Sequence, residues 1–240
     1  MKLKNIFFYT ICAFLLISFT FLIFTSFYRL SLFSSGTSVA YNKPTDYIII
    51  DAGHGGEDGG AVSDYGVLEK DINLEISRKL ADTMKVLGYT VKETRTTDTS
   101  LESSGDTTRE RKVSDMKNRL SVFNENTSNI VISIHQNKFT ESKYSGTQVF
   151  YSPNNDNSVV LAENIKSSVI SLTQPSNTRE CKKADNSIYL LKNATVPAVI
   201  VECGFISNQA ECEKLVTDDY QKEIAYSITI GYINFTNTNN

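Results

Sequence analysis

Three short, almost uninterrupted apolar runs constrain the fold of this 240-residue chain more than any other feature: residues 47–50, 130–134 and 196–201. Runs of this length without alternating polar residues are typical of strands that are buried on both faces of a parallel sheet. Between them, apolar residues recur at helical spacing, most clearly over 68–87. Strands that alternate with helices predict an α/β fold with a mostly parallel sheet.

The same patterns place the remaining elements. Further strands are expected at 89–94, 146–151 and 188–191, and further helices at 109–124, 157–172, 209–216 and 220–233. The polar residues after Ile233 are expected to fray, with 237–240 disordered. The length of the chain suits one domain with a sizeable core, which we expect over 46–236.

The N-terminal segment carries no charge from residue 6 to residue 28 and has basic residues on both sides. Such a run exceeds the apolar core of a signal peptide and is long enough to span a bilayer, with the N-terminus in the cytoplasm. The alternative is a cleavable signal that ends at 38–40, which reads SVA. On both interpretations, residues 1–33 are a membrane anchor or signal segment, residues 34–45 are a linker, and the domain is extracytoplasmic.

Net charge and cysteine content argue against two classes of protein. The formal net charge is −3 at pH 7, so a nucleic-acid-binding surface is not expected. The four cysteines include no C-x-x-C pair, and Cys12 lies in the apolar N-terminal segment. A disulfide framework is therefore not indicated, and the sequence does not choose a pair among Cys181, Cys203 and Cys212.

The chain has only two histidines, and each accompanies an apolar run. His54 follows the first run, His135 ends the second, and Glu202 ends the third. Because ligands of open α/β sheets bind outside the carboxyl ends of the strands, we expect these side chains at one edge. Glu69 starts the 68–87 helix and lies beside the glycine-rich loop that contains His54.

Two histidines and two glutamates make a complete set for metal-assisted hydrolysis. Catalytic zinc is commonly held by three protein ligands, such as two histidines and a glutamate, with water in the fourth position. A further carboxylate then serves as general base and later as general acid. The pattern therefore predicts a zinc-dependent hydrolase.

These residues also admit other interpretations. Glu69 could instead stabilise the positive end of a helix dipole, and Glu202 could form a structural ion pair with Arg95. The glycine-rich loop matches neither phosphate-binding motif, and the helix starts too far after the strand for a nucleotide site. Cys203 is a poor candidate nucleophile, because the adjacent Glu202 disfavours a thiolate.

Four spaced motifs carry a resemblance to a known family. They are residues 51–56 (DAGHGG), Glu69, residues 133–137 (SIHQN) and residues 197–208 (PAVIVECGFISN). In their order and spacing they resemble the zinc-dependent N-acetylmuramoyl-L-alanine amidases of the type-3 family. The resemblance spans about 47–233, which is nearly the whole exported part.

The resemblance implies a single domain with a twisted, mostly parallel sheet flanked by helices on both faces. It implies that His54, Glu69 and His135 are Zn²⁺ ligands and that Glu202 is the catalytic glutamate. The implied substrate is peptidoglycan, cut at the amide between N-acetylmuramic acid and L-alanine of the stem peptide. Asn137, just past His135, is a candidate for hydrogen bonding to the substrate, although it could equally be an ordinary polar loop residue.

A bare catalytic domain behind an N-terminal anchor is most similar to the spore-cortex, germination-specific amidases of endospore formers. This implies action in the forespore intermembrane space, where muramic-δ-lactam forms, and a lipoprotein activator as in some clostridial relatives. The alternatives are a vegetative-wall amidase, a zinc enzyme for another extracytoplasmic peptide amide, and an inactive wall-binding or scaffold protein. Gln136 departs from the alanine of many members and leaves the substrate choice open.

Overall fold

The computed structural model describes residues 18–21 and 47–238. The chain divides into two compact units, Met1–Lys43 and Pro44–Asn240, and residues 18–21, which are helical, are the described part of the first. None of the helices formed by the described residues is long and apolar enough to cross a bilayer. The predicted linker at 34–45, and all of the predicted anchor or signal except residues 18–21, lie outside the described residues.

The described strands of the second unit form one sheet of six strands in the order β2-β1-β3-β6-β4-β5. The strands are β1 (Ile48–Ala52), β2 (Val91–Glu93), β3 (Ile130–Asn137), β4 (Gln148–Tyr151), β5 (Lys182–Lys183) and β6 (Ala198–Phe205). Neighbouring strands run parallel except β4 and β6, which are antiparallel. The prediction of a mostly parallel sheet is confirmed.

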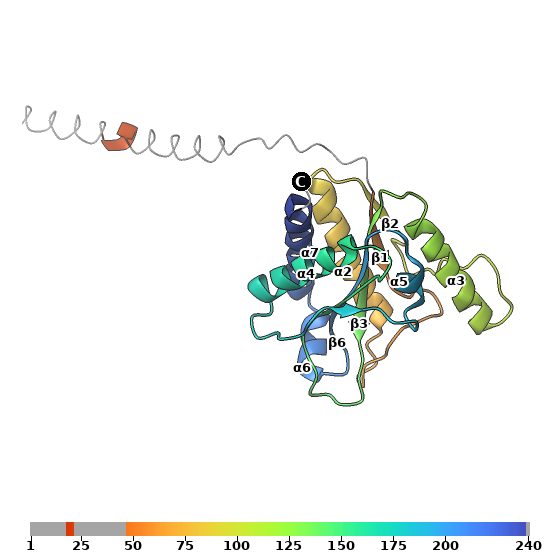
Figure 1. Cartoon of the computed structure of the whole chain (residues 1–240). Helices are drawn as coiled ribbons and strands as arrows, with labels where there is room; N and C mark the ends of the chain where they lie inside the picture. Colours follow the sequence, from red (N-terminus) through yellow and green to blue (C-terminus); the bar gives the residue numbers. More distant parts are fainter. Residues whose placement is uncertain (1–17, 22–46, 239–240) are drawn as a thin grey trace, which may run out of the picture. The chain divides into compact units, whose positions relative to one another are not determined.

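Helices cover both faces of this sheet (Figure 1). They are α2 (Glu69–Val86), α3 (Thr108–Phe123), α4 (Asn157–Leu172), α5 (Tyr189–Asn193), α6 (Gln209–Leu215) and α7 (Asp218–Thr238). One core cluster joins the sheet to α2, α4, α6 and α7, and a second cluster joins its other face to α3 and α5. This arrangement confirms the predicted α/β class with helices on both faces.

Strand β1 shows why the apolar runs contain almost no polar residues. All five of its residues are buried. Ile48 and Ile50 belong to the cluster with α2 and α7, whereas Ile49 belongs to the cluster with α3 and α5, because successive side chains of a strand point to opposite faces. Burial of each such side chain contributes about 1.5–3 kcal/mol, so the central strands form a firm support for the edge at which they end.

Two predicted elements were wrong. Residues 188–191 were expected to form a strand, but Tyr189–Asn193 is the short helix α5, which buries Leu190 and Leu191 together against the α3 face. The last helix was expected to end near Ile233 and its tail to fray. Instead α7 continues to Thr238, because Phe235 is buried in the core and contacts the ring of Tyr232.

Candidate active site

The carboxyl ends of β1, β3 and β6 lie side by side and carry three of the four residues predicted to bind the metal or to act as the catalytic base. Strand β1 pairs with β3 up to Ala52, two residues before His54. Strand β3 pairs with β6 so that His135 lies opposite Glu202. The parallel pairing therefore brings two histidines and a glutamate to one edge, as the sequence predicted.

His54 adopts an unusual backbone conformation that directs its ring toward this edge. Its φ is +61°, and it is the only non-glycine residue of the described chain with a positive φ. Its Nδ1 lies 2.8 Å from Oδ2 of Asp58, and its Nε2 lies 3.3 Å from Oε1 of Glu69. A Cβ at Gly60 would lie 2.8 Å from the His54 ring, so only glycine fits there. The loop thus holds Nδ1 of His54 through Asp58 and leaves Nε2 beside Glu69.

Glu69, the first residue of α2, lies between the two histidines. Its Oε1 is 2.9 Å from Nδ1 of His135 and also accepts a hydrogen bond from the backbone N–H of Gln136. Its Oε2 accepts from the backbone N–H of Ala61. Burial alone would raise the pKa of Glu69, but the hydrogen bonds from His135 and His54 outweigh burial and hold the pKa well below its usual range. Glu69 is therefore a buried carboxylate, and stabilisation of a helix dipole does not account for its contacts.

The three side chains form a donor set that fits one metal ion. One ligand atom from each of His54, Glu69 and His135 lies within 4.8 Å of the others, and the two ring centroids are 5.0 Å apart. No other group of this kind occurs within residues 18–21 and 47–238. Two imidazoles and a carboxylate match the ligand types and the number that catalytic zinc takes from proteins.

Glu202 lies beside this set without joining it. Its side chain is half-buried, and its Oε2 is inaccessible and has no hydrogen-bond partner in the structure. Burial raises the pKa of Glu202 to about 7, although electrostatic interaction with His135 opposes the shift. The alternative of an ion pair with Arg95 is wrong, because that guanidinium donates to backbone carbonyls elsewhere. Unpaired buried carboxylates with raised pKa values are common in catalytic sites.

Arg119 of α3 supports the His54 loop and was not predicted. Each of its five N–H groups has an acceptor: Asp115 takes two, and Asp51, the Ala52 carbonyl and the His54 carbonyl take one each. Only 1% of Arg119 and none of Asp51 is exposed. The buried guanidinium therefore fixes the backbone on both sides of Gly53.

Arg95, which follows β2, completes this support. It donates from Nε to the Ala52 carbonyl at 2.9 Å and from Nη2 to the Gly53 carbonyl at 3.0 Å. Together with Arg119, it binds three consecutive carbonyls of the segment that carries His54. No local sequence pattern indicates either arginine, since both act on a loop that lies 40 or more residues away in the chain.

Comparison with known proteins identifies the family. Residues 48–234 match the profile of the family described as N-acetylmuramoyl-L-alanine amidase. The chain belongs to the N-acetylmuramoyl-L-alanine amidase family. The germination-specific N-acetylmuramoyl-L-alanine amidase of Bacillus subtilis (strain 168) is 35% identical over 189 residues, which are 78% of each chain.

Solved structures of this amidase family share the fold. The CwlD amidase of Clostridioides difficile, in complex with the GerS lipoprotein, superposes with a TM-score of 0.77 and 39% identity, covering 80% of this chain and 98% of that one. An N-acetylmuramoyl-L-alanine amidase from Clostridium difficile 630 gives a TM-score of 0.69 and 26% identity, covering 81% and 98%. The resemblance to germination-specific amidases is thus confirmed.

The remaining candidate residues differ in their surroundings. Asn137 lies within β3 rather than in a loop, and its half-buried side chain has no hydrogen-bond partner among the described residues. Its role toward the substrate stays a prediction. Cys203 is fully buried, and burial raises the pKa of its thiol, which agrees with the weak case for a nucleophile. Gln136 donates from Nε2 to Asn73, whose own side chain donates to Glu69.

The raised pKa of Glu202 predicts a stability effect that does not depend on activity. Between pH 4.5 and pH 7 the folded, metal-free domain keeps a proton on Glu202 that the unfolded chain loses. The contribution of this proton to the free energy of unfolding is complete below pH 4.5 and is lost as pH rises through 7. We expect Glu202→Gln to stabilise the metal-free domain by about 1–3 kcal/mol at pH 8 and by much less at pH 5. Urea denaturation at both pH values measures this, and equal effects would contradict it.

Proposed function

We propose that this amidase is zinc-dependent and hydrolyses the bond between N-acetylmuramic acid and L-alanine of the peptidoglycan stem peptide. The observation that carries the proposal is the cluster of His54, Glu69 and His135 beside an unpaired, half-buried Glu202. The donor set fits zinc in ligand type and number. The family match supports the substrate.

In this proposal His54, Glu69 and His135 hold the metal, and hydrogen bonds with neighbouring residues fix the orientation of these ligands. When bound, zinc supplies Lewis acidity, which lowers the pKa of water and polarises a carbonyl group. Asp58 orients His54 by accepting from Nδ1, which leaves Nε2 for the metal. The backbone N–H of Ala61 fixes the second oxygen of Glu69.

Glu202 acts as the proton carrier. It takes a proton from the attacking water and returns it to the amine of L-alanine as that group leaves. A pKa near 7 suits both roles, because the group can accept and release a proton near neutral pH. Asn137, at the end of β3, is proposed to hydrogen-bond the substrate.

The biological setting is also a proposal. The germination-specific relative supports a role in spore cortex maturation, with formation of muramic-δ-lactam in the forespore intermembrane space. Attachment to the membrane through residues 1–33 rests on the charge-free N-terminal run. A lipoprotein activator is proposed because the CwlD amidase of Clostridioides difficile forms a complex with the GerS lipoprotein.

Digestion of purified walls tests the proposal. Residues 41–240, loaded with zinc, would be incubated with cortex and with vegetative peptidoglycan, with and without a spore-envelope lipoprotein fraction. The expected result is release of stem peptides with a free L-alanine amine, faster from cortex. Equal rates on both walls would contradict the cortex role, and absence of this product under all conditions would contradict the amidase assignment to these residues.

Metal loading is expected to depend on pH. Burial favours the neutral ring of His54, but hydrogen bonds to Asp58 and Glu69 outweigh it and raise the pKa to about 9 in the metal-free protein. Zinc must then displace a proton, so its affinity should rise up to about tenfold per pH unit between pH 6 and pH 9. Titration against a zinc-binding dye measures this. Asp58→Asn should flatten the dependence, and a pH-independent affinity in the unmodified protein would contradict the expectation.

A further inference from the structure

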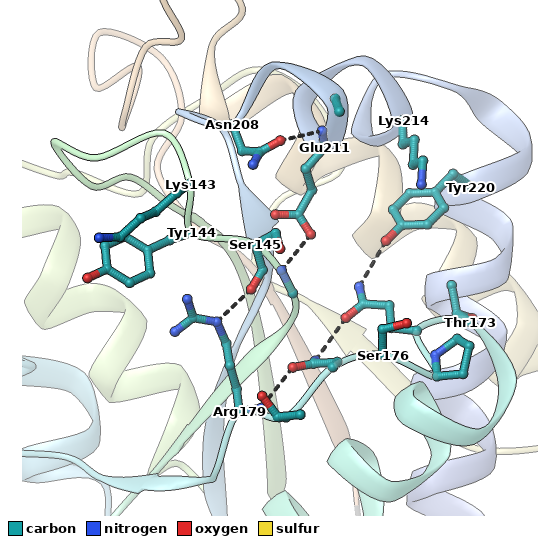
Figure 2. A pocket seen from close by; sticks show the side chains of 16 residues that line it. Lys143, Tyr144, Ser145, Thr173, Ser176, Arg179, Asn208, Glu211, Lys214 and Tyr220 are labelled. Atoms are coloured by element: carbon teal, nitrogen blue, oxygen red, sulfur yellow. Dashed lines mark hydrogen bonds between the residues drawn. The ribbon is translucent and has the colours of Figure 1, made fainter.

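A cavity of about 750 Å³ lies at the loops that follow β3 and β6 and is not used in the mechanism above (Figure 2). Its walls come from the loop after β3, the segment before β5, and helices α6 and α7. The lining includes Lys143, Tyr144, Arg179, Glu211, Lys214 and Tyr220. It is therefore polar and large enough for several residues of an extended peptide.

Hydrogen bonds and aromatic rings hold Arg179 in this cavity. Its Nε donates to the Ser145 carbonyl at 2.7 Å, and its Nη1 donates to Oε1 of Gln148 at 3.3 Å. The guanidinium lies 4.3 Å from the ring centroid of Phe205 and 5.6 Å from that of Tyr144. Stacking and hydrogen bonds thus hold the group in one orientation.

The one opposite charge in the cavity lining is Glu211, which Arg179 influences at a distance without forming an ion pair. Among the described residues, no carboxylate lies within ion-pair distance of Arg179, and its Nη2 has no hydrogen-bond acceptor. The nearest acidic lining residue, Glu211, is buried, and its two oxygens already accept from the backbone N–H groups of Gly146 and Phe205. Arg179 therefore keeps unused N–H donors and its positive charge for a ligand.

Two strand registers place Arg179 next to the site. Gln148, which accepts from Arg179, lies opposite Glu202 in the antiparallel pair of β4 and β6. Phe205, on which Arg179 stacks, lies opposite Asn137 in the pair of β3 and β6. Side chains directly opposite each other in an antiparallel pair share a face of the sheet. The Arg179 guanidinium thus contacts the strand neighbours of Glu202 and Asn137, two proposed site residues.

We propose that this cavity binds the acidic part of the stem peptide and that Arg179 is the receptor for one of its carboxylates. The inference rests on the proposed function, which places the L-alanine end of that peptide at Glu202. The lining carries three cations, Lys143, Arg179 and Lys214, and one buried carboxylate, Glu211; Lys143 already pairs with Glu141 outside the lining, so Arg179 and Lys214 remain for a ligand. A planar guanidinium with free donors matches a carboxylate in charge and geometry.

Kinetics on two substrates tests the inference. The substrates are a soluble muramoyl peptide with free carboxylates and the same compound with every carboxylate amidated. Arg179→Gln should raise KM for the free form about tenfold or more, leave kcat within about threefold, and leave KM for the amidated form unchanged. Arg179→Lys should recover part of the loss. Lys85→Gln, at the far end of α2 from Glu69, is the control and should change neither constant.

The outcomes separate this inference from the proposed function. Equal effects of Arg179→Gln on both substrates, or no effect on either, would overturn the inference. Loss of lipoprotein-dependent activation with KM unchanged would also overturn it, because that result would assign Arg179 to a partner interface. If no substrate is cleaved, calorimetry with the free stem peptide, without the sugar, gives the answer. Binding to the zinc-loaded protein that Arg179→Gln weakens tenfold would support the subsite, and absence of binding would overturn it.

Discussion

Glu202→Gln is expected to lower amide hydrolysis by roughly 10²–10⁴-fold, which is the contribution of a general acid–base group. Glutamine keeps the shape of the side chain but can neither accept the proton of water nor return it to the leaving amine. The half-buried position and the raised pKa of Glu202 support this role. Zinc content should stay unchanged, because Glu202 is not one of the three clustered donors.

The measurement is steady-state turnover with metal analysis on the same samples. Glu223→Gln, an identical substitution at an exposed position of α7, should stay within about twofold of the unmodified enzyme. Near-normal turnover of Glu202→Gln with zinc bound would show that another group carries the proton. A loss of activity together with a loss of zinc would move Glu202 into the metal ligand set.

Arg119→Met is expected to cost about 3–5 kcal/mol of unfolding free energy, because it leaves two buried carboxylates unpaired. Asp51 is fully buried, and burial would raise its pKa, but Arg119 and the Ser133 hydroxyl hold the pKa below its usual value. The His54 carbonyl also loses its donor. Zinc affinity should therefore fall as well, since the left-handed backbone at His54 is no longer fixed.

Urea denaturation of the metal-free domain and zinc titration measure the two effects. Arg109→Met, an exposed position on the same helix, should change stability by no more than about 0.5 kcal/mol. The stability loss of Arg119→Lys should lie between those of Arg109→Met and Arg119→Met, because an ammonium keeps the charge but has three donors instead of five. A loss below about 1 kcal/mol in Arg119→Met would contradict the importance of the buried network.

Features that depend on a strand and the residue at its end could be predicted from the sequence. The uninterrupted runs indicated buried parallel strands, and the polar residues that follow them are carried to one edge by parallel pairing. His54, His135 and Glu202 could therefore be placed together before the structure was known. Glu69 was less certain, because a first-turn glutamate also suits the helix dipole, and only its contacts with both histidines decide between the two.

Features that depend on tertiary contacts could not be predicted. Arg95 and Arg119 carry no local pattern, and they meet the His54 loop only after β2 and α3 have packed. Residues 188–191 have strand-like composition, yet packing of Leu190 and Leu191 on one face favours a helix. The extension of α7 likewise depends on burial of Phe235 among residues distant in the chain.

The central claim is that zinc held by His54, Glu69 and His135, with Glu202 beside it, serves to cleave the muramoyl-L-alanine amide. Mass spectrometry of a soluble muramoyl peptide, incubated in H₂¹⁸O with the zinc-loaded protein and the proposed lipoprotein activator, tests it most directly. The account predicts one ¹⁸O atom in the lactyl carboxylate of muramic acid, none in the released peptide, and no product after removal of zinc. Cleavage at another bond, or the same cleavage without zinc, would contradict it.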